Sequence, residues 1–103
     1  MTAAAEGIAK PVVLITGAGQ GIGAAITRRF AQQGAKLALV DVNIEQLEHL
    51  IGSLDACDTE ILPLCADVSN KEQVGKLVEQ VTERFGRIDV LVNNAGIIRD
   101  NLI

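Results

Sequence analysis

The sequence comprises 103 residues, of which 49% are hydrophobic, and it carries a formal net charge of −4 at pH 7. A chain of this length forms one domain at most, and its hydrophobic content suffices for a modest core. The negative charge argues against nucleic acid as a partner, and no apolar run approaches the ~20 residues of a membrane helix, so we expect no membrane partner. Residues 1–10 lack the basic start and long apolar core of a secretory signal, and we expect a flexible leader there, followed by the domain over 11–103.

A buried strand, a glycine-rich turn and a helix open this domain. The run 12–16 is β-branched and aliphatic, as in a parallel strand that is buried on both faces. Glycine then occupies every second position, at Gly17, Gly19, Gly21 and Gly23. Because glycine has no Cβ, the backbone can adopt positive φ there and can approach a ligand closely. The helix predicted over 22–33 starts at this turn, and its unpaired N–H groups form a site for an anion such as a pyrophosphate.

The next strand leads into an acidic residue whose position bears on ligand binding. It is predicted over 36–40 and leads into Asp41, 18 residues after Gly23. An acid at this point accepts hydrogen bonds from the adenosine ribose hydroxyls in dinucleotide-binding folds. A glycine-rich turn by itself also fits a tight strand–helix connection without a ligand. Here strand, turn, helix, strand and acid follow in order, and together they predict dinucleotide binding.

A second helix and a third strand follow. Asn43 is the expected N-cap of this helix, with Gln46 as its capping-box partner, and the helix should end near Gly52. The third strand is predicted over 60–66. Pro63 removes one ladder donor from it, so this strand should lie at an edge of the sheet.

The third helix and the fourth strand complete the pattern. The segment 69–72 (Ser-Asn-Lys-Glu) is a capping box. The helix should end at Gly86 and carry one apolar stripe, made of Val74, Leu77, Val78, Val81 and Phe85. The strand predicted over 88–92 is apolar apart from Asp89, which is typical of a central strand in a complete sheet. The alternation predicts an α/β fold, half of a Rossmann-like doubly wound parallel sheet with strand order 3-2-1-4 and helices on both faces.

Few other residues carry reactive side chains. His49 is the only histidine and falls on the second helix, where we expect it to be solvated rather than catalytic or metal-bound. Cys57 and Cys65 form neither a C-x-x-C pair nor a disulfide framework, so we expect two reduced thiols in a cytoplasmic protein. We expect no metal site.

Two motifs resemble those of one family. The spacing of Thr16-Gly17-x-x-x-Gly21-x-Gly23 differs from the commonest dinucleotide fingerprint, G-x-G-x-x-G. The segment 93–96 (Asn-Asn-Ala-Gly) follows the fourth predicted strand. In both features the chain resembles the short-chain dehydrogenase/reductase family, over nearly its whole length. The stretch 96–102 resembles the 3-oxoacyl-(acyl-carrier-protein) reductase branch in particular.

The resemblance implies roles for the residues of the glycine-rich turn. By analogy with the family, the cofactor pyrophosphate is held by Gly17, Gln20, Gly21, Ile22 and Gly23. We further expect Ile22 to lie half in the core and half beneath the cofactor.

The resemblance also implies contacts to the adenosine moiety. Asp67 and Val68 match the positions that flank the adenine ring, and Asn94, Ala95 and Gly96 match the segment beside its ribose. Asp67 also fits a turn or cap residue before the third helix. The asparagines also fit a role in joining neighbouring strand ends, and both roles can hold at once.

The charge at the end of the second strand favours NAD over NADP. A carboxylate at Asp41 repels a 2′-phosphate, whereas NADP-specific sites place an arginine nearby. The neighbours Val40, Val42 and Asn43 are neutral, and so is Gln20. Many acyl-carrier-protein reductases use NADP, which weakens the substrate assignment more than the cofactor assignment.

The catalytic groups of the family are expected elsewhere. Its members use a Tyr-x-x-x-Lys pair with a serine and an asparagine, and this sequence contains no tyrosine. We therefore expect no catalytic residue and no turnover in these 103 residues. The expected function is the dinucleotide-binding half of a homo-oligomeric oxidoreductase, which transfers hydride between NAD(H) and a carbonyl or alcohol, with a 3-oxoacyl thioester as the favoured substrate. The alternatives are a non-catalytic NAD-binding module and a truncated fragment.

Overall fold

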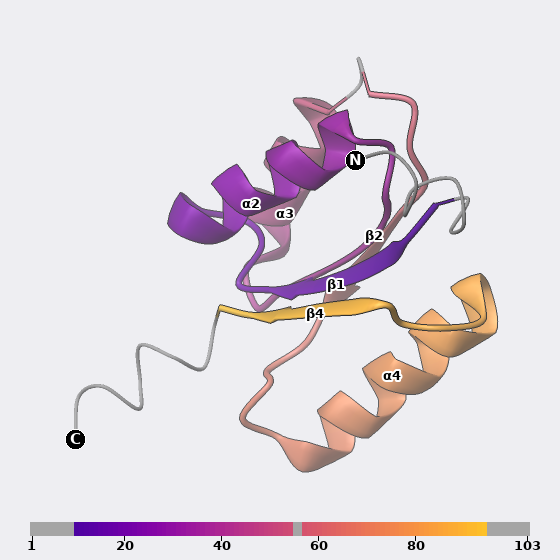
Figure 1. Ribbon diagram of the computed structural model, residues 1–103. Coiled ribbons are helices and arrows are strands. Elements are labelled where there is room, and N and C mark those ends of the chain that lie inside the picture. The colour runs from indigo at the N-terminus through magenta and orange to yellow at the C-terminus, as the bar shows by residue number, and fades with distance from the viewer. Residues whose placement is uncertain (1–9, 55–56, 95–103) are drawn as a thin grey trace.

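The fold is a four-stranded parallel sheet with helices on both faces. The structure is a computed structural model, and it describes residues 10–54 and 57–94. Its elements, in chain order, are β1 (Val12–Thr16), α2 (Gly21–Gln32), β2 (Lys36–Asp41), α3 (Ile44–Gly52), β3 (Ile61–Cys65), α4 (Lys71–Phe85) and β4 (Val90–Asn93). The strand order is β3-β2-β1-β4. Figure 1 shows α2 and α3 on one face of the sheet and α4 on the other. The predicted fold class and strand order are thus confirmed.

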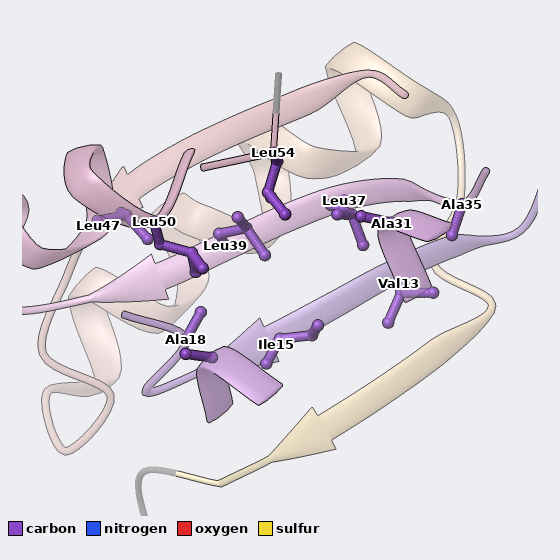
Figure 2. Close-up of a cluster of buried hydrophobic side chains, with 11 residues drawn as sticks. Val13, Ile15, Ala18, Ala31, Ala35, Leu37, Leu39, Leu47, Leu50 and Leu54 are labelled. Atoms are coloured by element: carbon purple, nitrogen blue, oxygen red, sulfur yellow. The ribbon is translucent and has the colours of Figure 1, made fainter. Parts of the chain in front are cut away.

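Both faces of the two central strands are buried, as their unbroken apolar sequence predicts. Every residue of β1 is buried, and so is every residue of β2 except Lys36. On one face, the side chains of the two strands pack against Ala31 of α2 and Leu47 of α3 (Figure 2). On the other face, they pack against Leu77 and Val81 of α4. Complete burial of one such aliphatic side chain stabilises the fold by about 1.5–3 kcal/mol, so these two layers hold the sheet between its helices.

The two edges of the sheet differ. Among the described residues β3 is the outermost strand in the order β3-β2-β1-β4, which confirms the edge position predicted for it. Its exposed Pro63 pairs in register with Leu39 of β2. At the other edge, β4 pairs with β1 from Val13↔Val90 to Thr16↔Asn93. Within the described residues β4 has no second neighbour, and its central position in a complete sheet stays a prediction.

Local details depart from the sequence predictions at two helix starts. Asn43 is confirmed as the N-cap of α3, because its Oδ1 accepts a hydrogen bond from the Gln46 N–H at 3.0 Å. The reciprocal role of Gln46 is wrong, since the Asn43 N–H donates to Asp41 Oδ1 instead. Asn70 rather than Ser69 caps α4.

A third difference concerns the apolar stripe of α4. The cap of α4 is the Asn70 Oδ1, which accepts from the Gln73 N–H at 3.1 Å, while the Ser69 N–H and hydroxyl both donate to the Asp67 carboxylate. Leu77 and Val81 are buried, whereas Val78 is 38% exposed, so its inclusion in the stripe is wrong. A helix turns about 100° per residue, which carries Val78 away from the face that Leu77 and Val81 share.

The predicted leader, apart from Lys10, lies outside the described residues, as do Ala95 and Gly96.

Candidate functional site

A cleft of about 530 Å³ lies at the carboxyl ends of the strands. It opens where the chain direction around the sheet reverses: α2 follows β1 on one face, and α4 precedes β4 on the other. Parallel α/β sheets bind ligands at such a switch point. The residues that line the cleft are Gly17, Gln20, Gly21, Ile22, Val40, Asp41, Val42, Ala66, Asp67, Val68 and Asn94.

The structure therefore brings most of the sequence-predicted site residues together. Nine of them lie in the described part of the chain, and all of these except Gly23 line the cleft. Three lining residues were missed, namely Val40, Val42 and Ala66. A usable signal existed for them, because each directly adjoins one of the two predicted acids at a strand end.

The start of α2 has the properties of an anion site. Gly17 and Gly21 take positive φ angles of 61° and 54°, which only glycine adopts without strain. The N-cap residue, Gln20, makes no side-chain capping bond, and the first turn of α2 contains no acidic residue. By contrast, α3 and α4 each have an asparagine cap and a glutamate in the first turn. The positive end of α2 is thus left for a ligand to neutralise.

Gly23 does not line the cleft but permits the close packing of α2 on β1 behind it. It is buried in the first turn of α2, where a Cβ atom would overlap the carbonyl of Gly17 and lie 2.9 Å from Asn94 Nδ2. Only glycine lets α2 approach β1 this closely. Ile22, next to it, is 71% exposed, so the expectation that it lies half in the core is wrong. The core-facing side of α2 is formed by Gly23, Ala24, Thr27 and Ala31.

Asp41 lies at the rim of the cleft and is only 7% exposed. Its Oδ2 accepts a hydrogen bond from the Gly19 N–H at 2.9 Å, and its Oδ1 accepts one from the Asn43 N–H at 3.0 Å. An ionised carboxylate has about four acceptor sites, so two backbone bonds leave capacity for ribose hydroxyls. The residues that line the cleft include no lysine or arginine.

Asp67 occupies the turn between β3 and α4. Its Oδ1 accepts hydrogen bonds from the Ser69 N–H at 2.9 Å and from the Ser69 hydroxyl at 2.7 Å. The turn role that the sequence left open for Asp67 is therefore confirmed. Asp67 and the adjacent Val68 also line the cleft, as a contact with adenine would require. That contact stays a prediction.

Polar side chains join the ends of β1 and β4. The Thr16 hydroxyl lies 3.3 Å from Asn93 Oδ1, and Asn94 Nδ2 donates to the Gly17 carbonyl oxygen at 3.3 Å. The predicted role of the asparagines in joining strand ends is confirmed. Asn94 also holds the first residue of the glycine-rich turn, and thereby shapes the cleft it lines.

The remaining reactive side chains do not form a second site in the described residues. His49 is exposed in the last turn of α3. No cluster of three or more potential metal ligands occurs in 10–54 and 57–94. Over the same residues, every helix is too short or too polar to cross a membrane.

Comparison with known proteins places this geometry in context. The sequence model for "short chain dehydrogenase" matches residues 11–103. The 3-oxoacyl-[acyl-carrier-protein] reductase FabG of Thermotoga maritima is 45% identical over 92 residues, which cover 89% of this chain and 37% of the relative.

Solved structures agree. L-sorbose reductase from Gluconobacter frateurii, complexed with NADPH and L-sorbose, superposes with a TM-score of 0.79 at 38% identity, over 82% of this chain and 33% of that one. The 3-ketoacyl-(acyl-carrier-protein) reductase from Brucella melitensis, complexed with NADH, superposes with a TM-score of 0.69 at 39% identity, over 79% and 32%. This chain thus spans about a third of the length of these three proteins.

Proposed function

The chain belongs to the short-chain dehydrogenase/reductase family, and we propose that it supplies the dinucleotide-binding half of a longer oxidoreductase. The observation that carries this proposal is the uncapped start of α2, which faces a cleft with Asp41 at its rim. The pyrophosphate of a nicotinamide dinucleotide fits the positive helix end. The same cleft offers a carboxylate acceptor for the adenosine ribose.

Within this proposal each part of the cleft has a role. The N–H groups at the start of α2, near Gly21 and Ile22, bind the pyrophosphate. Asp41 accepts hydrogen bonds from the ribose hydroxyls, and Asp67 and Val68 flank the adenine ring. Asn94, with Ala95 and Gly96 after it, lies beside the adenosine ribose. The bound cofactor supplies or accepts a hydride, and the residues of this chain bind and orient it.

The preferred cofactor is NAD. The similar solved structures contain NADPH in one case and NADH in the other, so the family relationship leaves the choice open. Charge supports NAD here, because Asp41 is nearly buried at the ribose position and the residues that line the cleft include no cation for a 2′-phosphate. A phosphate beside this carboxylate would face like-charge repulsion of several kcal/mol.

The proposed reaction is hydride transfer between NAD(H) and a carbonyl or alcohol. A 3-oxoacyl thioester is the favoured substrate, which the identity of 45% to a 3-oxoacyl-[acyl-carrier-protein] reductase supports. We further propose that the full-length protein, meaning the natural chain that contains these residues, is a homo-oligomer in the cytoplasm. The free thiols of Cys57 and Cys65 are consistent with that reducing compartment.

Titration of the full-length protein with NADH and with NADPH tests the proposal. We expect NADH to bind at least about tenfold more tightly, because the phosphate of NADPH meets Asp41. Equal affinity, or tighter NADPH binding, would refute the choice of NAD. Failure to bind either nucleotide would refute the dinucleotide site itself. Glu48→Gln, which removes an exposed carboxylate on α3, serves as the control for a general change in charge.

A further inference from the structure

Asp41 both lines the cleft and is hydrogen-bonded to the glycine-rich turn. Its Oδ2 accepts from the Gly19 N–H at 2.9 Å, and its Oδ1 accepts from the Asn43 N–H at 3.0 Å. One carboxylate therefore links the turn after β1 to the turn that leads into α3. We propose that Asp41 is a positioning residue for the pyrophosphate-binding turn, in addition to any role it has toward the ribose.

The packing around Gly19 supports this role. A Cβ atom on Gly19 would lie 3.0 Å from Asp41 Oδ2 and 3.2 Å from the backbone nitrogen of Leu47. The preceding residue, Ala18, is fully buried, and its N–H donates to the Val40 carbonyl oxygen at 3.1 Å. The middle of the turn is thus held against the end of β2 by two consecutive N–H groups, one of which depends on the Asp41 side chain.

The chemistry of the two bonds demands a carboxylate. Backbone N–H groups only donate, so the side chain between them must present two acceptor oxygens. An asparagine side chain has the same shape but one oxygen and one NH₂ group. It would satisfy either Gly19 or Asn43 and turn a donor toward the other. A ribose hydroxyl, by contrast, both donates and accepts, and can still pair with an asparagine.

The substitution Asp41→Asn therefore separates the two roles. Loss of the bond to Gly19 should loosen the turn and weaken any ligand that binds through its pyrophosphate. The direction of the change in affinity distinguishes the two roles, because removal of a negative charge from the cleft would by itself strengthen the binding of an anionic ligand. A variant in which Asp41 alone is replaced in order to favour NADP should consequently bind both dinucleotides more weakly than the wild type.

The inference rests on the proposed function, and its first test uses two ligands with the full-length protein. These are NADH and an NADH analogue whose adenosine ribose lacks both hydroxyls. We expect Asp41→Asn to weaken both by a similar factor of about ten. If Asp41 acts on the ribose alone, the substitution leaves the affinity for the analogue unchanged or raised, and the inference is wrong. Glu48→Gln should alter neither affinity.

The second test needs no ligand. The Gly19 amide should be protected from hydrogen exchange in the wild-type protein and lose about tenfold of that protection in Asp41→Asn, relative to the Ala18 amide. Unchanged protection would overturn the inference. If the wild-type protein bound neither dinucleotide, the proposed function would fail, and this measurement would still decide the role of Asp41.

Gly19→Ala approaches the same contact from the other side. Its methyl group would press on Asp41 Oδ2 and on the backbone of α3, and it should reproduce the loss of affinity for the analogue. In the double variant with Asp41→Asn the two losses should be less than additive, because both remove one interaction. Full additivity would argue that Gly19 and Asp41 act separately and would contradict the proposal.

Discussion

The backbone of Gly23, in the first turn of α2, lies directly against the carbonyl group of Gly17 at the end of β1. A Cβ atom on Gly23 would overlap the carbonyl oxygen and lie 2.8 Å from the carbonyl carbon. We expect Gly23→Ala to lower the free energy of unfolding by about 1–3 kcal/mol, because the methyl group must push α2 away from the sheet. The displaced turn should also lose dinucleotide affinity.

Gly75→Ala is the matched control for this substitution. Gly75 lies within α4, and a Cβ atom there would meet no atom within 4 Å. Alanine is the better helix former by roughly 0.5–1 kcal/mol, so this variant should be more stable than the wild type. Chemical denaturation of the three proteins provides the comparison, and equal stability of Gly23→Ala and the wild type would contradict the packing argument.

Asp41→Ala should change cofactor preference. The variant loses the carboxylate that accepts from the ribose, and hydrogen bonds to a charged group contribute about 1.5–3 kcal/mol, so NADH should bind roughly ten- to a hundredfold more weakly. The affinity for NADPH should fall by a smaller factor, because its phosphate no longer meets a negative charge, so the preference for NADH should relax. Titration of both nucleotides against wild type, Asp41→Ala and the exposed-site control Asp58→Ala measures the ratio of affinities; an unchanged ratio would speak against Asp41 as the selector.

The isolated 103-residue chain should not turn over substrate. Hydride transfer to a carbonyl requires a group that protonates the oxygen, and the tyrosine that serves the family in this role does not occur in the sequence. Loss of NADH absorbance with an acetoacetyl thioester as substrate is the measurement, and the full-length protein is the positive control. Measurable activity of the purified chain would overturn the prediction.

Asp89 should make stability depend on pH. Its Oδ2 accepts from the Val12 N–H at 2.8 Å and from Arg87 Nε at 2.9 Å. The Val12 hydrogen bond, with a further contribution from Arg87, holds the pKa of Asp89 below its ordinary value of 3.8, although desolvation acts in the opposite direction. Since the folded-state pKa is the lower one, the stabilisation is present above pH 3.8 and is lost as the pH falls through the folded-state pKa.

Asp89→Asn tests this dependence. The variant should be less stable than the wild type at neutral pH, and the difference should shrink as the pH falls below 3.8. Denaturation curves collected between neutral and strongly acidic pH give the difference directly. Glu83→Gln, an exposed carboxylate on α4, should show no comparable trend, and a difference for Asp89→Asn that stays constant with pH would argue against the linkage.

The edge formed by β4 should cause the isolated chain to associate. Val90 is 36% exposed and Leu91 is 62% exposed, and among the described residues β4 pairs with β1 alone. Unpaired strand edges with apolar side chains are templates for other strands. We expect the 103-residue chain to dimerise or aggregate, and Leu91→Lys to reduce this tendency, since a charge at the edge opposes pairing.

Light scattering on both proteins at increasing concentration measures the association. A monodisperse, cooperatively melting wild-type monomer at high concentration would show that the β4 edge is not adhesive. Gln80→Lys, at an exposed position on α4 beside β3, controls for the effect of net charge, because it adds the same positive charge away from the β4 edge.

The sequence by itself determined the architecture and most of the cleft. Unbroken apolar runs and the helical period of 3.6 residues are local properties, and they located the strands and helices to within two residues at each end. Pro63 lacks a backbone N–H donor, and this predicted that β3 lies at an edge. The glycine spacing predicted an anion site at the start of α2. Each of these inferences needed only neighbours along the chain.

For several polar groups, only the tertiary structure decided which hydrogen-bond partner they take. Asp41 bonds to Gly19, and Asn94 bonds to Gly17 across 77 positions of sequence. Local signals predicted Ser69 as a cap and Ile22 as partly core. Both predictions were wrong, because Asn70 caps α4 and the Ser69 hydroxyl donates to Asp67, and because Ile22 lies outside the core-facing side of α2. A hydrogen-bond donor can pair with any acceptor that folding brings within reach. The partner therefore depends on distances in the folded structure, which the pattern of residues along the chain does not specify.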